Sequence, residues 1–544
     1  MTDVAVTYTD APANRSPVSP RAMRARLVPP FFESPLWGWV APLLITAMAG
    51  YMRFNRLRIP SSKIFDEVYY THDAHSLYHY GVELNNTDNG PGFIVHPPLG
   101  KWMIAFGEWI VGDPAGTNSF GWRLSAAICG TLAILILART VRRMTRSTML
   151  GCVAGLLMSL DGLEYVQSRT SMLDIFMMFW IVVAFAFLIL DRDQVRARLA
   201  AKVTAIDRPD DARGPNPPAR PARHGPRIGF RWWLLCCGIS IGAAAACKWD
   251  GAYYIPAFAL LALFWTMGAK RAAGVEAPFV STLFRDLPAA LFTMAVVPVI
   301  TYIASWTGWF LNTGKYAWDR DWANNRPVSW GLGFIPTWIR NPIRGLWHYH
   351  WEAYNFHVHL DSYHKYRSNG WGWLFETRPV LYYADYPHSD SNPNLGCHTG
   401  GLGCARMIYD MGTPAIWWAS IPVMIFMLYL VFRRDWRASA ALLPFLFGFL
   451  PWLFTFKRTM FYFYALPLLP FICVALALTI GYMIGPRDAS PNRRMAGAMV
   501  GGSYLLIVIV LFFYFLPVLS ARTIPFTSWQ QHMWFNSWSE DSGS

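Results

Sequence analysis

Residues 459–486 read TMFYFYALPLLPFICVALALTIGYMIGP and contain no Asp, Glu, Lys or Arg. A helix needs about 20 apolar residues to cross the hydrocarbon core of a bilayer, so this stretch is long enough to span one. Six further stretches lack these charged residues: 36–52, 251–269, 287–314, 411–432, 438–456 and 495–521. Shorter apolar candidates lie at 124–138, 148–160, 175–190 and 232–247, which makes eleven predicted spans.

The composition is that of a membrane protein, because only 15% of the 544 residues are charged, against about 25% in soluble domains. The net charge of +14 comes largely from basic residues in every second connection: 15–26, 139–146, 192–231, 270–285, 433–437 and 487–494. The positive-inside rule therefore places these connections and the N-terminus in the cytoplasm, and the C-terminus outside. This alternation favours anionic lipid headgroups as partners and argues against nucleic acid.

The chain divides into a polar N-terminus (1–35), a membrane domain (36–521) and an outer tail (522–544). We expect the N-terminus and the Arg/Pro/Ala-rich connection 191–231 to be disordered in the cytoplasm. Two long loops, 54–121 and 312–410, must build the outer surface.

Cysteines and histidines in the second outer loop allow two readings each. Cys397 and Cys404 have six residues between them, so a disulfide is expected in an oxidising exterior, with two free thiols as the alternative. The segment 348–364 holds five histidines and many aromatic residues. It fits an interfacial helix, and metal binding is the other interpretation.

The first outer loop contains KIFDEVYYTHDAHSLYHYG (63–81), in which Asp66 and Glu67 are adjacent. Neighbours on a helix point about 100° apart, so these carboxylates do not form a proton-sharing pair. Two separate roles are more natural: one carboxylate acts as a general base, and the other orients a substrate. The alternative is a helix start in which acids simply favour the positive end of the dipole.

Other charged side chains gather at the outer ends of the predicted spans, where they are costly unless they pair or serve function. The basic members suit a partly buried phosphate site, and the alternative is snorkelling with structural ion pairs. A transporter would instead bind near the bilayer midplane. These charged residues are Lys101, Arg123, Asp161, Glu164, Arg169, Asp174, Lys248, Asp250, Lys457 and Arg458.

Several short motifs follow one another along the chain: FDEVYY (65–70), HPPLGK (96–101), GWRL (121–124), QSRTSMLD (167–174), KWDG (248–251), DSYHKYRSNGWGWLF (361–375), GTPAIWW (412–418) and RTMFYFYALPLLPFI (458–472). In this order they resemble the protein O-mannosyltransferase family, across nearly all of 36–520. The resemblance implies an all-α polytopic membrane protein with a GT-C type glycosyltransferase fold. It also implies transfer of mannose from a polyprenyl-phosphate carrier to Ser or Thr of secreted or membrane proteins, with inversion at the anomeric carbon.

The resemblance also assigns roles to residues. Asp66 inherits the catalytic-base role and Glu67 an acceptor-side role, while Arg123 matches a required arginine at the start of the second span. Donor-phosphate contacts are inferred from charge for Lys101, Lys248 and Arg458, and the remaining motif residues expected to bind substrate are His96, Arg169, Asp174 and Trp249. The scheme requires no metal or cofactor.

Two departures from the family pattern suit a bacterial plasma-membrane form with a decaprenyl-type carrier. The loop 312–410 has no room for the β-trefoil domain of eukaryotic members, and Tyr69–Tyr70 stand where those members are expected to carry His-Phe. Expected partners are the lipid donor, the bilayer and Ser/Thr-rich secretory acceptors, with a secretion translocon as a further candidate. A related enzyme acting on lipid or cell-wall glycan is the alternative function.

Overall fold

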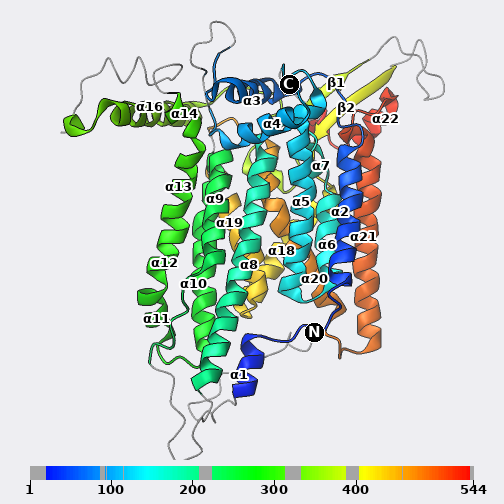
Figure 1. Cartoon of the computed structure of the whole chain (residues 1–544). Helices are drawn as coiled ribbons and strands as arrows, with labels where there is room; N and C mark the ends of the chain where they lie inside the picture. The colour runs from blue at the N-terminus through cyan, green and yellow to red at the C-terminus, as the bar shows by residue number, and fades with distance from the viewer. Residues whose placement is uncertain are drawn as a thin grey trace, which may run out of the picture.

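The structure is a computed structural model that describes residues 20–85, 92, 95–113, 115–206, 223–312, 332–386, 403–455 and 457–539. Long helices run side by side, with α3, α4, α16 and a small sheet across one end and α1 at the other (Figure 1).

Eight helical segments in the described part of the chain are long and apolar enough to cross a membrane. They are α5 (Ser119–Thr145), α8 (Leu173–Ile206), η1 with α10 (Trp249–Ala272), α12 with η2 and α13 (Leu287–Ser305), α18 (Pro414–Phe432), α19 (Trp436–Leu453), η5 with α20 (Tyr462–Ile484) and α21 (Pro491–Leu519). Three further helices coincide with the other predicted spans: α2 (Trp37–Phe54) and the two shorter helices α6 (Thr148–Ser159) and α9 (Trp232–Cys247). The protein is thus a mostly helical multi-pass membrane protein, with one small sheet where the sequence predicted an all-α fold, and eleven crossings remain a prediction.

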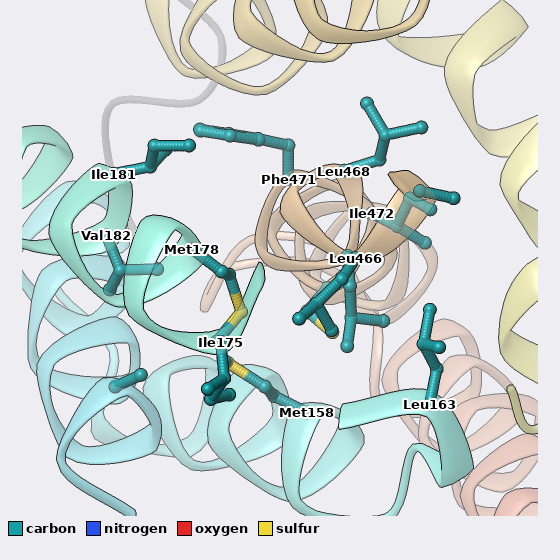
Figure 2. Close-up of a cluster of buried hydrophobic side chains, with 14 of the residues drawn as sticks. Met158, Leu163, Ile175, Met178, Ile181, Val182, Leu466, Leu468, Phe471 and Ile472 are labelled. Atoms are coloured by element: carbon teal, nitrogen blue, oxygen red, sulfur yellow. The ribbon is translucent and has the colours of Figure 1, made fainter. Parts of the chain in front are cut away.

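The helix α20 is the centre of the bundle, because η5 and α20 are buried at nearly every position from Tyr462 to Ile480 and become exposed only near the end of α20, at Met483. An apolar surface on every side is the pattern expected of a helix surrounded by other helices. Residues of η5 and α20 lie against α8 and the α6–α7 region in one apolar cluster (Figure 2), whose labelled members are Met158, Leu163, Ile175, Met178, Ile181, Val182, Leu466, Leu468, Phe471 and Ile472.

The end that carries α3 and α4, which we call the outer end because the sequence predicts that it faces outward, is built from the two long loops and the C-terminal segment. The first loop contributes α3 (Glu67–Tyr80) and α4 (Leu99–Ile110), and α7 (Gly162–Gln167) follows α6. The second contributes α16 (Thr337–His359), α17 (Gly370–Trp373), β1 (Val380–Asp385) and β2 (Cys404–Asp410), preceded by α14 (Thr307–Leu311) and η3 (Leu332–Phe334). The antiparallel sheet has the order β1-β2-β3, with Val380 opposite Asp410 and Ala405 opposite Ile524 of β3 (Ile524–Pro525).

The C-terminal segment therefore closes back onto the second outer loop. After β3 come α22 (Phe526–His532) and η6 (Asn536–Trp538). The side chain of Trp538 is fully buried, and its Nε1 donates a hydrogen bond to the Glu376 carbonyl at 2.6 Å. The tail is thus part of the framework of the outer surface.

Parts of the two segments expected to be disordered are helical, namely 20–27 within 1–35 and 191–206 within 191–231, and for these parts the prediction was wrong. Helix α8 continues to Ile206, and α1 (Pro20–Leu27) and α11 (Pro278–Arg285) lie at the same end of the bundle (Figure 1). Arg196 donates to the Leu27 carbonyl at 2.9 Å, and Leu27 and Leu199 share a small apolar cluster. Buried contacts therefore order these charged segments, and residues 207–222 lie outside the described part.

A buried ion pair joins α2 to α7 and generates the first prediction. Arg53 and Glu164 are both fully buried and paired. Arg53→Met leaves a buried carboxylate without its cation, which should cost about 3–5 kcal/mol. We expect a clear fall in the apparent Tm in detergent micelles. The measurement is the fraction of the protein that stays monodisperse after heating. The double variant Arg53→Met/Glu164→Met removes both charges and should recover most of the loss, and equal damage in the two variants would contradict this interpretation.

Candidate functional site

Asp66 stands at the junction between the first outer loop and α3, directly after an unusual backbone turn. Phe65 has φ 47°, a left-handed conformation that is uncommon for a bulky residue. Its ring stacks on Tyr382 of β1, with centroids 4.6 Å apart, and meets the edge of Phe461 at 5.6 Å. The second outer loop therefore holds Phe65, and Asp66 follows it half-buried, with Tyr70 donating to its Oδ2 at 3.4 Å.

Glu67 is fully buried and every lone pair of its carboxylate is used. Oε1 accepts hydrogen bonds from Arg123 Nε at 2.8 Å and from the Ser171 amide at 3.0 Å. Oε2 accepts from Arg123 Nη2 at 2.7 Å and from the Ile64 amide at 3.0 Å. Four acceptor sites are the full capacity of a carboxylate, so Glu67 has none left to offer a substrate in this arrangement.

Arg123, on α5, uses its remaining donors to hold the loop that leads to α3. Nη1 donates to the carbonyls of Leu57 at 3.2 Å and Pro60 at 2.7 Å, and Nη2 donates to Ser62 at 3.1 Å. A rigid, planar guanidinium is the side chain that can serve this many acceptors at once. The pair Arg123–Glu67 thus ties the loop, α3 and α5 together immediately beside Asp66.

The pKa of Asp66 is set by two opposing effects. Burial raises its pKa from the usual range to about 6, and the Lys248 ammonium and the Tyr70 hydroxyl offset part of that rise. A carboxylate with a pKa near 6 is mostly ionised at neutral pH and is a stronger base than an exposed Asp.

Three basic side chains lie on the side of the site toward α16. Lys248 Nζ is paired with Asp174 of α8 at 2.8 Å and lies 4.0 Å from the centroid of the Tyr464 ring. Arg458 Nη2 donates to His357 Nδ1 at 2.9 Å, while its buried Nε has no hydrogen-bond partner among the described residues. His96 lies 5.2 Å from His357, centroid to centroid, and within the described part its ring makes no hydrogen bond.

The two histidines are neutral donors. His357 Nε2 donates to the Val95 carbonyl at 2.9 Å, which leaves Nδ1 to accept from Arg458 and defines the tautomer. Burial and the Arg458 charge lower the pKa of His357 to about 4. Burial and the surrounding cations Lys248, Lys101 and Arg458 hold the pKa of His96 well below its usual value. A site in which added positive charge is unfavourable favours an anion.

Two basic residues that were predicted to bind substrate make other contacts in the structure. Lys101 is buried between Asp73 at 2.9 Å and Glu83 at 3.0 Å, an arrangement that joins α3 to α4. Arg169 donates to the carbonyls of residues 52, 53, 55 and 56 and so caps the C-terminal end of α2. These two cations support the framework, and they do not belong to the group formed by Lys248, Arg458 and His96.

Trp249 is positioned by a chain of hydrogen bonds to α16. Its Nε1 donates to Tyr302 Oη at 2.9 Å, and that oxygen is 2.7 Å from His350 Nε2. His350 Nδ1 donates to the Leu346 carbonyl, so Nε2 is the acceptor. The indole also lies against His350 and His357, with centroids 6.0 and 5.6 Å away.

Some neighbours of the site could not be identified from the sequence pattern. Gln167 Nε2 donates to Tyr382 Oη at 2.7 Å and to Asp410 Oδ1 at 3.2 Å, which links α7 to the sheet. Gln167 opens a recognised motif, but nothing local to Tyr382 or Asp410 signals that they meet it.

The histidines and cysteines of the second outer loop were considered for metal binding and for a disulfide. No group of three or more His, Cys, Asp or Glu within the described ranges could hold a metal ion. His350 and His357, from the histidine-rich segment, are engaged in the contacts above. Cys404 is disulfide-bonded and six other cysteines are free, while Cys397 lies outside the described residues.

Comparison with known proteins gives a consistent result over almost the whole chain. Residues 43–199 match the dolichyl-phosphate-mannose-protein mannosyltransferase family, and residues 342–538 match the C-terminal four-TMM region of protein-O-mannosyltransferase. A polyprenol-phosphate-mannose–protein mannosyltransferase of Mycolicibacterium smegmatis is 36% identical over 97% of this chain and 99% of the relative. Similar relatives are those of Mycobacterium tuberculosis (35% identical, 96% of each chain) and Corynebacterium glutamicum (34% identical, 91% of this chain and 92% of the relative).

A solved structure confirms the fold. The Pmt1–Pmt2 protein O-mannosyltransferase complex of Saccharomyces cerevisiae, bound to the sugar donor, matches with a TM-score of 0.70. The match covers 95% of this chain and 94% of that chain at 14% identity. The bundle is therefore the GT-C fold that the motif resemblance predicted.

The contacts of Arg123 predict a local effect of its substitution. Lysine has three donors and no planar fork, so Arg123→Lys cannot hold Glu67 and three carbonyls together. We expect faster amide hydrogen exchange in 57–67, measured by mass spectrometry, with little change in α20. Arg58, an exposed cation of the same loop, gives the control Arg58→Lys. Unchanged exchange in 57–67 for Arg123→Lys would show that the loop does not depend on this arginine.

Proposed function

This chain belongs to the protein O-mannosyltransferase family, and on that premise we propose that it transfers mannose from polyprenyl-phosphate-mannose to Ser or Thr hydroxyls of secreted and membrane proteins. It is a glycosyltransferase, and its acceptors are proposed from the names of its relatives. The main structural support is one juxtaposition: a half-buried Asp66 of raised pKa beside basic side chains whose hydrogen-bonding capacity is incompletely used.

Asp66 is assigned the role of general base. It accepts the proton of the acceptor hydroxyl as the oxygen attacks the anomeric carbon, and the bond from that carbon to the phosphate oxygen breaks. The leaving group departs as polyprenyl phosphate, so no strong general acid is needed. A single displacement inverts a β-linked donor to an α-linked product.

The phosphate is assigned to Lys248, Arg458 and His96. Arg458 Nε and the His96 ring are the donors left open, and Lys248 supplies charge from its pair with Asp174. Preorganised cations stabilise negative charge as it develops on the leaving oxygen, without rearrangement during the reaction. Trp249 is positioned to pack against the donor beside them.

Glu67 is assigned a positioning role in place of the acceptor contact expected from its motif. Its oxygens hold Arg123 and two backbone amides, so its effect on catalysis passes through the placement of Asp66. Holding a reacting group within a fraction of an ångström is worth orders of magnitude in rate.

The proposed site faces the exterior of the plasma membrane. Two observations support this orientation: the positive-inside rule favours the cytoplasm for the basic connections, and α3 and α4 lie at the opposite end of the bundle from α1 (Figure 1). Acceptors then arrive as secreted, Ser/Thr-rich segments, and a secretion translocon is a candidate supplier. A lipid or cell-wall glycan acceptor is the competing proposal.

Substitution of Asp66 tests both the base and the acceptor class. Asp66→Asn should lower turnover by about 10²–10⁴-fold, the usual contribution of a general base. The assay uses membranes, a polyprenyl-phosphate-mannose donor and a Thr/Pro-rich peptide, with mannosylated peptide as the readout. Asp361→Asn, an exposed carboxylate of the second outer loop, is the matched control. Near wild-type turnover in Asp66→Asn would remove Asp66 as the base, and mannose transfer to lipid alone would favour the competing acceptor.

The pKa of Asp66 predicts the pH dependence. A base must be deprotonated, so kcat/KM should fall as pH drops through about 6, the folded-state pKa. Because Lys248 lowers that pKa, Lys248→Met should move the acidic limb to higher pH as well as reduce the plateau. Lys457→Met, an exposed neighbour of Arg458, should leave the limb in place. A limb that stays fixed in Lys248→Met would show that another group controls it.

A further inference from the structure

Helix α16 has three distinct faces. At about 100° per residue, Ile343, Trp347, Trp351, Tyr354 and Val358 fall within an arc of about 80°. All five are apolar or aromatic and strongly exposed, with 76% of Trp347 and 55% of Trp351 accessible. We call them the apolar face. The polar residues Arg344, His348, Glu352, Asn355 and His359 lie on a second face.

The third face attaches α16 to the end of a membrane-spanning helix. Leu346, Tyr349 and Ala353 pack with Trp306 and Trp309 in one buried cluster. Trp309 Nε1 also donates to the Pro342 carbonyl at 3.1 Å. These contacts fix the level of α16 at the outer end of the span Leu287–Ser305.

The direction of the helix is the second observation. Figure 1 shows α16 leaving the bundle sideways, across the direction of the spans, at the level of the outer helices. At this outer end, α4 also exposes apolar side chains, those of Phe106, Trp109 and Ile110. Two separate elements thus present Trp together with other apolar residues at the outer end of the bundle, where a bilayer around the spans would have its surface.

We propose that α16 lies in the outer leaflet surface, with its apolar face among the lipid acyl chains and its polar face in water. A helix with Trp and other apolar residues along one face and polar residues along the opposite face is the form that binds in the interface plane. A water-exposed stripe of this kind is unfavourable, since five large side chains would remain hydrated. Lipid therefore explains the face better than solvent does.

The same helix carries two histidines of the proposed site. His350 and His357 lie at the edge of the buried face that adjoins the apolar face, and His357 holds Arg458 while His350 ends the hydrogen-bond chain from Trp249. A carrier lipid that approaches along α16 would reach these groups directly from the leaflet. Helix α16 thus holds Arg458 and its basic neighbours at the level of the carrier phosphate.

The location can be tested without any assay of activity. Spin labels at Trp351→Cys and Val358→Cys, and at the polar-face controls Glu352→Cys and His359→Cys, whose side chains are the more exposed ones of that face, are compared in vesicles of phosphatidylethanolamine and phosphatidylglycerol. The free native cysteines are replaced by Ala. Power saturation should show the first pair accessible to oxygen and protected from a nickel chelate, and the second pair the reverse. Equal chelate access to both faces would overturn the proposal in favour of water, and shielding from both reagents at 351 would overturn it in favour of a protein partner.

A kinetic test rests on the proposed function. Trp347→Gln/Trp351→Gln should raise the apparent KM for a long polyprenyl donor in vesicles by about tenfold, or about 1.4 kcal/mol, with kcat and the KM for peptide nearly unchanged. A short donor with two isoprene units should be used as well as by the wild type, and His348→Gln/Asn355→Ala is the control. Equal KM values for the long donor would refute a role in carrier delivery. Absence of any transfer by the wild type would count against the proposed function alone, because the spin-label result does not depend on it.

Discussion

The outer site depends on the buried ion pair between Glu67 and Arg123. Two charges removed from water are stable only when hydrogen bonds satisfy both, and here the carboxylate accepts four while the guanidinium also holds three carbonyls of the preceding loop. This pair connects α5, the first outer loop and the start of α3. This pair also sets the position of Asp66, because Asp66 directly precedes Glu67, whose side chain is held by four hydrogen bonds.

Charged side chains serve two purposes at this end of the fold. Glu67, Lys101 and Arg169 are buried with their partners and build the framework. Asp66, Lys248 and Arg458 keep unused capacity, since Lys248 has one ionic partner, and all three lie near Tyr464. A substrate can be bound only by groups of the second kind, because breaking a satisfied buried pair would cost several kcal/mol. Burial and hydrogen bonding therefore distinguish structural from substrate-binding charges better than charge does.

The sequence was informative where the signal is local. Uncharged runs located α18, α19, α20 and α21 closely, because a bilayer requires length and apolarity alone. The adjacent acids at 66 and 67 predicted two separate roles, which stay a prediction, and their surroundings differ: Glu67 is fully buried and Asp66 is half-buried. Contacts between segments that are distant in the sequence could not be predicted. Nothing near Arg169 indicates that it caps α2, and nothing near Asp410 indicates that it accepts a hydrogen bond from Gln167. Helical structure in 191–206 was missed because charge density suggested disorder, whereas Leu199 packs against Leu27.

The most direct test of this account is a structure of the protein in lipid with a non-hydrolysable phosphonate analogue of polyprenyl-phosphate-mannose. The account predicts density for the phosphonate between His96, Lys248 and Arg458, with the anomeric carbon turned toward Asp66 and the Glu67–Arg123 pair intact. A phosphonate bound at Lys101 or Arg169, or a sugar turned away from Asp66, would contradict it.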